Sequence, residues 1–200
     1  LHVEGLYSKT GIPNIRFSPS YPPTSGPNGP GSVGVFTAPV TNPGVLTALQ
    51  QAGLSPGVIG ATNNVSLTLF RALGAGGNPA ENYGGQVGSR TYDIYRVSAS
   101  LSGEIGGIGW DTAVTYSDAT SDQTTTDILI DRLQRALNGF GGFNCTGTTP
   151  GQNGCQYFNP FSNGYSGNPA IGLTNPGYVS ANANNPELVR SLFDPQRTQN

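Results

Sequence analysis

The sequence is poor in charge, begins without methionine and contains no long apolar run. Charged residues make up 10% of its 200 residues, and the formal net charge is −2. So few charges argue against the basic surface of a nucleic-acid-binding protein and against a charge-driven disordered tail. No run of about 18 apolar residues is present, which excludes a transmembrane helix. Because there is no initiating Met, we expect the chain to be a fragment.

Residues that carry chemistry are scarce as well. The chain has one His and two Cys, and it lacks HExxH, GxSxG, a P-loop and a GxGxxG in a βαβ setting. Asp118 and Asp122 lie in a polar stretch, where Asp is usually a turn residue and only occasionally a calcium ligand. We therefore expect no enzymatic activity, no cofactor and no metal site.

Turn-forming residues are what the chain has in abundance. It contains 30 Gly and 16 Pro, which together are nearly a quarter of the sequence. Hydrophobic residues account for 35%, where a soluble domain has about 45–50% on a count that includes Gly. This composition argues against an ordinary globular core.

The clearest pattern is a pair of alternating runs, 96–104 and 110–117. Each alternates apolar with polar residues, which is typical of a strand with one apolar and one polar face. The short sequence Gly106-Gly107-Ile108-Gly109 separates the runs, so together they predict an antiparallel hairpin. The expected apolar face carries Val97, Ala99, Leu101, Trp110, Val114 and Tyr116, and the polar face carries Arg96, Ser98, Ser100, Ser102, Glu104, Asp111, Thr115 and Ser117.

Other segments are expected to be shorter. Residues 1–10 alternate loosely and predict a strand, as do residues 65–73. Asn42 before Pro43 predicts a helix that ends at Gly53, and the Asn-Pro pair at 185–186 predicts another that ends near 193. After that helix we expect the chain to end without a further strand.

The most secure helix is expected at 127–137, with Asp127 in its first turn. Arg132 and Arg135 lie near its end, where the helix dipole favours cations. A solvated face is the favoured interpretation of the two arginines, and an anion clamp is the alternative. The expected buried face carries Leu129, Leu133, Ala136 and Leu137.

Cys145 and Cys155 enclose nine residues, all of them Thr, Gly, Pro, Gln or Asn. The turn-rich spacer can bring the two residues together, and no His or second Cys pair is present to complete a zinc site. We therefore predict a disulfide, which points to an oxidising compartment.

Taken in order, the plan is a strand at about 1–10, a loop at about 11–90, strands at about 91–104 and 110–118, and a loop at about 119–200. A compact soluble domain rarely tolerates one structureless connection beyond about 15 residues. Two such loops at one end of a sheet, with a tight turn at the other, are typical of an outer-membrane barrel. We therefore predict a mainly β fold, in which residues 1–200 are part of one transmembrane β-barrel domain of antiparallel strands with long loops that contain short helices.

In a barrel the apolar face of the hairpin would contact outer-membrane lipid and the polar face would line the lumen. Trp110, beside the tight turn, is expected in the periplasmic aromatic girdle. Tyr92, Tyr95 and Tyr116 are expected near the outer girdle. A water-soluble antiparallel sheet with one buried face predicts the same alternation, and only the asymmetry of the loops separates the two.

The segments that carry a resemblance are YRVSASLSGEIGGIGWDTAVTYSDA, DILIDRLQRALNGFGG, the Cys pair, QYFNPFS and NPELVRSLF. In this order they resemble the middle of the barrel of a TonB-dependent outer-membrane receptor, in particular the large receptors of alphaproteobacterial type. The resemblance covers about 90–195 by these motifs and 1–90 by architecture. It implies a bacterial outer-membrane location and energised uptake of a scarce extracellular small molecule, such as a siderophore, cobalamin or a saccharide. Contact with TonB is then expected through a missing N-terminal region.

The alternative is a secreted, loop-rich β module that binds a glycan or another protein. Four loop aromatics, Tyr157, Phe158, Phe161 and Tyr165, are the candidate ligand-facing residues in either case. Aromatic rings can stack on sugars, and they can also pack a loop together. Packing of the loop is the favoured interpretation.

Overall fold

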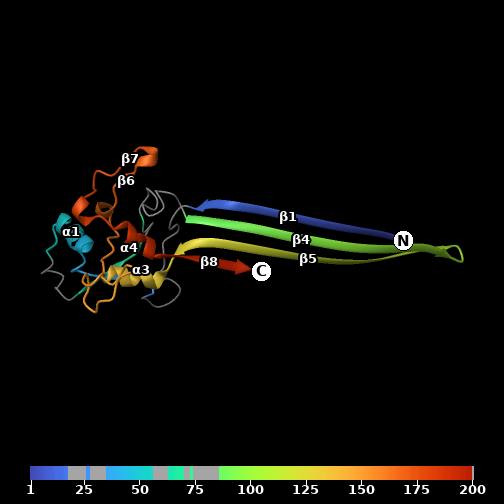
Figure 1. Ribbon diagram of the computed structural model, residues 1–200, viewed down its shortest axis with the longest axis horizontal. Coiled ribbons are helices and arrows are strands. Elements are labelled where there is room, and N and C mark those ends of the chain that lie inside the picture. The colour runs from blue at the N-terminus through green and yellow to red at the C-terminus, as the bar shows by residue number, and fades with distance from the viewer. Residues whose placement is uncertain (18–25, 28–34, 56–62, 70–72, 74–85, 200) are drawn as a thin grey trace. The chain divides into compact units, whose positions relative to one another are not determined.

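The computed structural model describes residues 1–17, 26–27, 35–55, 63–69, 73 and 86–199 (Figure 1). The chain divides into two compact units. The first, here called the strand unit, comprises Leu1–Ile15, Val87–Thr125 and Gln196–Asn200. The second, the loop unit, comprises Arg16–Gln86 and Thr126–Pro195. The fold is mainly β with antiparallel sheets, which confirms the coarse fold class expected from the sequence.

The main sheet has four strands: β1 (His2–Phe17), β4 (Gln86–Ile105), β5 (Ile108–Ile128) and β8 (Phe193–Gln199). They lie side by side in the order β1-β4-β5-β8, and Figure 1 shows that neighbouring arrows run in opposite directions. The order of the strands in the sheet is therefore the same as their order in the sequence. Among the described residues the sheet is open, with β1 and β8 as its two edges.

The predicted hairpin is present as β4 and β5. Its register runs from Gly88 opposite Thr125 to Ile105 opposite Ile108. The turn between the strands is therefore only Gly106 and Gly107, with φ of 60° and 82°. Positive φ at both central positions is the requirement of a type I′ turn, whose twist matches that of the flanking strands.

The strands are longer than the alternation predicts. β1 continues to Phe17 and β5 to Ile128, although the expected limits are about 10 and 118. Beyond these limits apolar residues no longer alternate, so the signal used to find the strand disappears. The extension of β5 is rich in Thr, a β-branched residue that suits strands. The expectation that no strand follows the last helix is wrong, because β8 adds to the sheet there.

Among its described residues, the loop unit has three α-helices: α1 (Pro43–Gln51), α3 (Ile130–Leu137) and α4 (Pro186–Ser191). Two small sheets pair β2 (Phe36–Pro39) with β3 (Asn64–Leu67) and β6 (Gly167–Asn168) with β7 (Leu173–Thr174). Single 3-10 turns lie at Ser162–Gly164, Pro169–Ile171 and Ser180–Asn182. Among the described residues, no helix has the length and apolar character needed to cross a membrane.

The starts of α1 and α4 confirm the two Asn-Pro predictions. Asn42 accepts hydrogen bonds from the amides of Gly44 and Val45, and Asn185 accepts one from Glu187. The strand predicted at 65–73 is present only in part, because β3 ends at Leu67; residues 70–72 lie outside the described part of the chain. The start predicted for α3 is wrong, because Asp127 is still in β5 and the helix begins at Ile130.

One apolar core holds the loop unit together. The side chains that α3 contributes include Leu133, Ala136 and Leu137, as predicted, while Leu129 is the residue before the helix. Other helices contribute Val45 from α1 and Leu188 from α4. The remaining buried members are Phe36, Ala38, Leu69, Leu73, Ile128, Phe158, Val189 and Leu192.

Two polar side chains join the segment before β4 to the segment after β5. Gln134 of α3 donates to the carbonyl of Thr37 in β2 and accepts from its amide, at 2.7 and 3.1 Å. Asn42 donates to the carbonyls of Leu137 and Phe158, at 2.9 and 3.0 Å. The two long connections of the sheet therefore fold as one unit.

Candidate functional site

The strand unit exposes a continuous apolar face, here called the apolar band. The register places Ala99 opposite Val114 and Val97 opposite Tyr116, which confirms the predicted grouping of side chains. These side chains are largely uncovered: Val114 keeps 70% of its surface exposed. The residues that β4 and β5 contribute to the band are Tyr95, Val97, Ala99, Leu101, Ile105, Ile108, Trp110, Val114 and Tyr116.

β1 extends the apolar band sideways. Its Tyr7 hydroxyl donates to Asp93 at 3.1 Å, and Lys9 Nζ lies 3.4 Å from the same carboxylate. Since side chains alternate along a strand, the odd-numbered residues of β1 share the face of the odd-numbered residues of β4. Val3 and Tyr7 therefore add to the band, with exposed fractions of 61% and 68%.

The apolar band has a definite length. On β4 it extends from Tyr95 to Ile105, about 11 residues, and at about 3.4 Å per residue this stretch measures about 34 Å along the strand. Beyond Tyr95 the same face carries Asp93 opposite Thr120, and then Thr91 opposite Asp122. The change begins at Tyr95 itself, which lies opposite Asp118, and the face is polar beyond this pair.

Tyrosines mark this change. The rings of Tyr95 and Tyr116 have centroids 5.8 Å apart, and their hydroxyl oxygens are 3.5 Å apart. Tyr7 donates to Asp93, a carboxylate of the polar part. Tyrosine combines an apolar ring with a polar tip, which suits a boundary between an apolar and an aqueous environment.

The prediction for Tyr92 is wrong. The register places it opposite Ser121, on the polar face of the sheet, so it does not lie beside Tyr95 and Tyr116. Its ring lies under the guanidinium of Arg90, 5.9 Å from centroid to Cζ. The reason is parity, because an even-numbered residue of β4 points away from the band.

Trp110 lies near the other end of the apolar band, opposite Gly103. A Cβ atom placed on Gly103 would come within 2.8–2.9 Å of indole atoms, so the ring of Trp110 covers this glycine. Gly103 has no side chain to cover its own backbone, and the indole ring of Trp110 covers it instead. Trp110 is the single Trp of the chain.

The opposite face of the sheet is polar, as predicted. Ser98 lies opposite Thr115, and Arg96 lies opposite Ser117. The Ser98 hydroxyl donates to Glu4 of β1 at 2.9 Å, so polar contacts continue across to the neighbouring strand. The sheet thus has one apolar and one hydrogen-bonding face.

In the loop unit, Cys145 and Cys155 form the predicted disulfide, with an S–S distance of 2.10 Å. The enclosed loop contains Gly151, Asn153 and Gly154, all with positive φ. It is also held by a hydrogen bond from the amide of Thr146 to the carbonyl of Asn153, at 3.3 Å.

The four candidate aromatics pack within the loop unit. Phe158 is completely buried and meets Tyr165 edge to face at 6.5 Å. Burial raises the pKa of the Tyr165 phenol well above its usual range. Phe161 packs against the core, and Tyr157 lies across Gly139 and Gly151. These positions support the favoured interpretation, that the aromatics hold the loops together, and they leave Phe158 no surface for a ligand.

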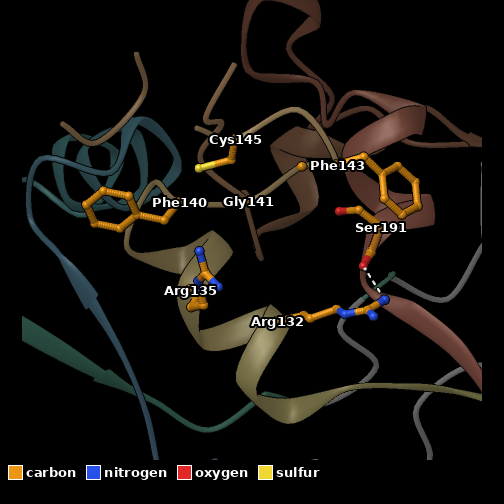
Figure 2. Close-up of a pocket in the computed structure, with 8 residues that line it drawn as sticks. Arg132, Arg135, Phe140, Gly141, Phe143, Cys145 and Ser191 are labelled. Atoms are coloured by element: carbon orange, nitrogen blue, oxygen red, sulfur yellow. Dashed lines mark hydrogen bonds between the residues drawn. The ribbon is translucent and has the colours of Figure 1, made fainter. Parts of the chain in front are cut away.

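Arg132 and Arg135 line a cavity of about 300 Å³ beside α3 (Figure 2). Phe140, Phe143 and Cys145 also line it, from the segment after the helix. The sequence suggested an anion clamp only as the alternative to a solvated face. It gave no signal that a loop returns over the two arginines, because that return depends on Gly turns and the disulfide.

The described residues include no group of three or more His, Cys, Asp or Glu side chains that could hold a metal ion. The two features with functional character are therefore the apolar band of the strand unit and the arginine-lined cavity of the loop unit. Comparisons of the chain with protein-family models, with curated proteins and with solved structures find no match.

Proposed function

We propose that the chain is part of a TonB-dependent receptor of the bacterial outer membrane. In this proposal the four-stranded sheet is a sector of the transmembrane barrel, and the loop unit belongs to the outer, ligand-facing side. The receptor takes up a scarce small molecule, such as a siderophore, cobalamin or a saccharide. The observation that carries the proposal is the apolar band with its row of tyrosines.

The length and composition of the apolar band support a lipid contact. A strand crosses a bilayer with about 9–11 residues when tilted by about 45°, and the stretch from Tyr95 to Ile105 has this length. From Val97 to Ile105 on β4, and from Ile108 to Tyr116 on β5, this face carries no charged side chain. Thr112, opposite Leu101, is the one hydroxyl residue other than tyrosine that β5 contributes there, and Asp118, opposite Tyr95, lies at the end of the band. A charge on a lipid-facing position would cost about 2–4 kcal/mol at mid-depth.

The connections of the sheet support the same orientation. Gly106 and Gly107 close the hairpin in two residues, whereas 18–85 and 129–192 connect the strands at the opposite end. Outer-membrane barrels have short periplasmic turns and long extracellular loops. Trp110 then lies at the periplasmic interface, and Tyr7, Tyr95 and Tyr116 lie at the outer one.

A soluble sheet would need a different explanation for its exposed apolar face. Apolar surface is worth about 25 cal/mol per Å² when it is removed from water, so a soluble sheet covers such a face with a second layer. Among the described residues nothing covers Ile108, which is 73% exposed, or Val114. Lipid provides that cover in the proposed barrel.

Fluorescence quenching by brominated lipid tests the proposal. In a Trp110→Phe background, a single Trp is placed at Val97, in the apolar band, or at Ser98, its neighbour on the polar face. Lipid contact predicts strong quenching of the first variant and little quenching of the second in vesicles. Equal quenching of both variants, or none in either, would contradict a lipid-facing band.

A further inference from the structure

We propose that the cavity beside α3 binds a small organic carboxylate with an apolar or aromatic body. The cavity lies within the loop unit and has a volume of about 300 Å³, which suits a small molecule. Of the described residues that line it, only Arg132 and Arg135 are charged. The cavity is therefore electropositive.

Arg132 has a fixed position. Its Nη1 donates to the backbone carbonyls of Ser191 and Phe193, at 3.2 and 3.1 Å. Figure 2 shows the bond to Ser191 at one side of the cavity. This guanidinium joins α3 to the end of α4, and it keeps a positive charge at the cavity wall.

Arg135 is the second cation that lines the cavity, and unlike Arg132 it is not fixed by hydrogen bonds to the described residues. Its side chain has no hydrogen bond or ion pair with any residue that the structure describes. In Figure 2 its guanidinium points from α3 toward the segment of Gly141 and Cys145. A carboxylate bound to the planar guanidinium of Arg135 would supply the acceptors that this side chain lacks among the described residues.

Aromatic side chains select an organic anion rather than an inorganic one. Phe140 and Phe143 line the cavity, and Phe143 keeps 62% of its surface exposed. A ligand with an aromatic or aliphatic body would cover the Phe143 ring, whereas inorganic phosphate would leave it in water. The combination of two arginines with two phenylalanines therefore favours an apolar carboxylate.

A second cavity of the loop unit, of about 240 Å³, lacks such groups. It is lined in part by Asn42 and Asn159, whose side chains are occupied with other parts of the fold. Asn159 donates to Asn163 and to the carbonyl of Asn182 and accepts from the amide of Phe161. The side-chain amides of both residues are engaged in hydrogen bonds within the protein, so few of their donors and acceptors are available to a ligand.

If the chain is part of a receptor, the carboxylate is the molecule that the receptor transports, and this role rests on the proposed function. Binding of the carboxylate in the cavity does not rest on it. The two ideas fail separately. Loss of lipid quenching at Val97 would overturn the barrel and leave the anion site standing. Absence of anion binding in a chain that shows lipid quenching would overturn only the anion site.

Calorimetric titration of the oxidised 200-residue chain in detergent tests the site with benzoate as the probe. Benzamide has the same ring without the charge, acetate has the charge without the ring, and inorganic phosphate represents a simple anion. We expect benzoate to bind more tightly than acetate or phosphate, and benzamide to show no binding. Benzamide binding equal to that of benzoate, phosphate binding at least as tight, or no benzoate binding would overturn the proposal.

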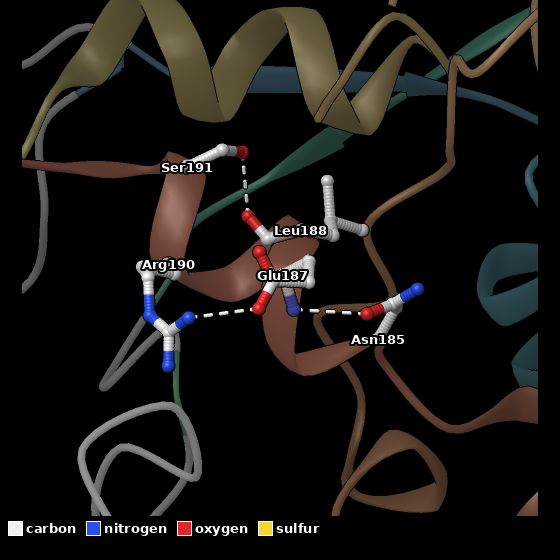
Figure 3. Close-up of polar contacts among 5 residues, drawn as sticks. All are labelled: Asn185, Glu187, Leu188, Arg190 and Ser191. Atoms are coloured by element: carbon white, nitrogen blue, oxygen red, sulfur yellow. Dashed lines mark hydrogen bonds and ion pairs between the residues drawn. The ribbon is translucent and has the colours of Figure 1, made fainter. Parts of the chain in front are cut away.

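Variants locate the site. Arg135→Gln is expected to weaken benzoate binding by about tenfold or more, since a charge-assisted bond to a carboxylate is lost. Arg190→Gln is the matched control, because Arg190 is an exposed arginine of α4 that pairs with Glu187 at 2.7 Å and does not line the cavity (Figure 3). The control is expected to bind benzoate normally. Equal weakening in both variants, or none in Arg135→Gln, would contradict the assignment.

A measurement on the unaltered chain avoids any folding defect of a variant. Hydrogen–deuterium exchange with and without benzoate is expected to show slower exchange in the peptide that covers α3 and Gly141. Slower exchange confined to peptides elsewhere in the chain would place the carboxylate outside this cavity and overturn the proposal.

Discussion

Asn42 uses one buried side chain to serve three segments. Its oxygen accepts from the amides of Gly44 and Val45 at the start of α1, and its nitrogen donates to the carbonyls of Leu137 and Phe158. The residue is completely buried, so water cannot replace these bonds. Asn185 has the simpler role of an exposed helix cap, as Figure 3 shows.

Replacing these two asparagines should therefore have unequal effects. Asn42→Ala removes the cap and leaves two buried carbonyls without their donor, which should cost about 2–4 kcal/mol. Asn185→Ala removes only a cap and should cost about 1 kcal/mol. Hydrogen–deuterium exchange of the peptides that cover α1 and α3 measures the difference. Similar effects of both changes would show that Asn42 acts as a cap alone.

Tyr165 should make the loop unit sensitive to alkali. The folded chain holds the phenol proton more tightly than the unfolded chain, because burial raises the pKa of Tyr165. Its contribution to stability is therefore complete below about pH 10, the unfolded value, and is lost as pH rises further. Urea midpoints should fall above this pH, and less steeply in Tyr165→Phe than in the control Tyr178→Phe. Identical pH dependence in all three chains would contradict this account.

Residue roles could be predicted where they depend on near neighbours in sequence. The Asn caps, the disulfide and the alternating faces of the hairpin are all local patterns. Tyr92 shows the limit, because its aromatic ring favours a position beside Tyr95 and Tyr116, whereas strand parity places it on the polar face. The packing of Phe158, and the cavity that Phe140 and Phe143 line together with Arg132 and Arg135, depend on tertiary contacts that no local pattern encodes.

The turn of the hairpin is the element with the strictest requirement. Gly107 has φ of 82°, a value that a residue with a Cβ adopts only at a cost. Gly109 has open space around its Cβ position and no such φ. Gly107→Val should therefore lower the stability of the hairpin by about 1–2 kcal/mol, whereas Gly109→Val should be nearly neutral. Thermal unfolding in detergent, followed by circular dichroism of the strands, compares the two; equal midpoints would argue against the type I′ turn.

For helices and strands, the sequence predicts their presence better than it predicts where they begin and end. The helices α1 and α4 begin at the expected Asn-Pro pairs, and the hairpin has the expected centre. The ends of β5 and α3 were misplaced, because both are decided by pairing and packing rather than by a sequence signal. β8 was missed for the same reason, since its pairing partner β5 lies far away in the sequence.

At the scale of the whole molecule, the open edges of the sheet predict dependence on detergent or lipid. β1 and β8 each leave one edge unpaired among the described residues. Open edges and an uncovered apolar face both promote association between chains. The isolated chain should sediment as aggregates in aqueous buffer and as a defined species in detergent micelles. A soluble monomer with a cooperative thermal transition would contradict the barrel proposal.

The hydrogen bonds between the two long connections limit how these connections can be transferred to another protein. Gln134 and Asn42 tie residues before β4 to residues after β5, and the shared core includes Phe36 from one and Leu188 from the other. Transplanting one connection onto another scaffold would break these hydrogen bonds and expose the core residues that the other connection now covers. The smallest portable piece is therefore the pair of connections together, and a change of binding specificity by exchange would have to move both at once.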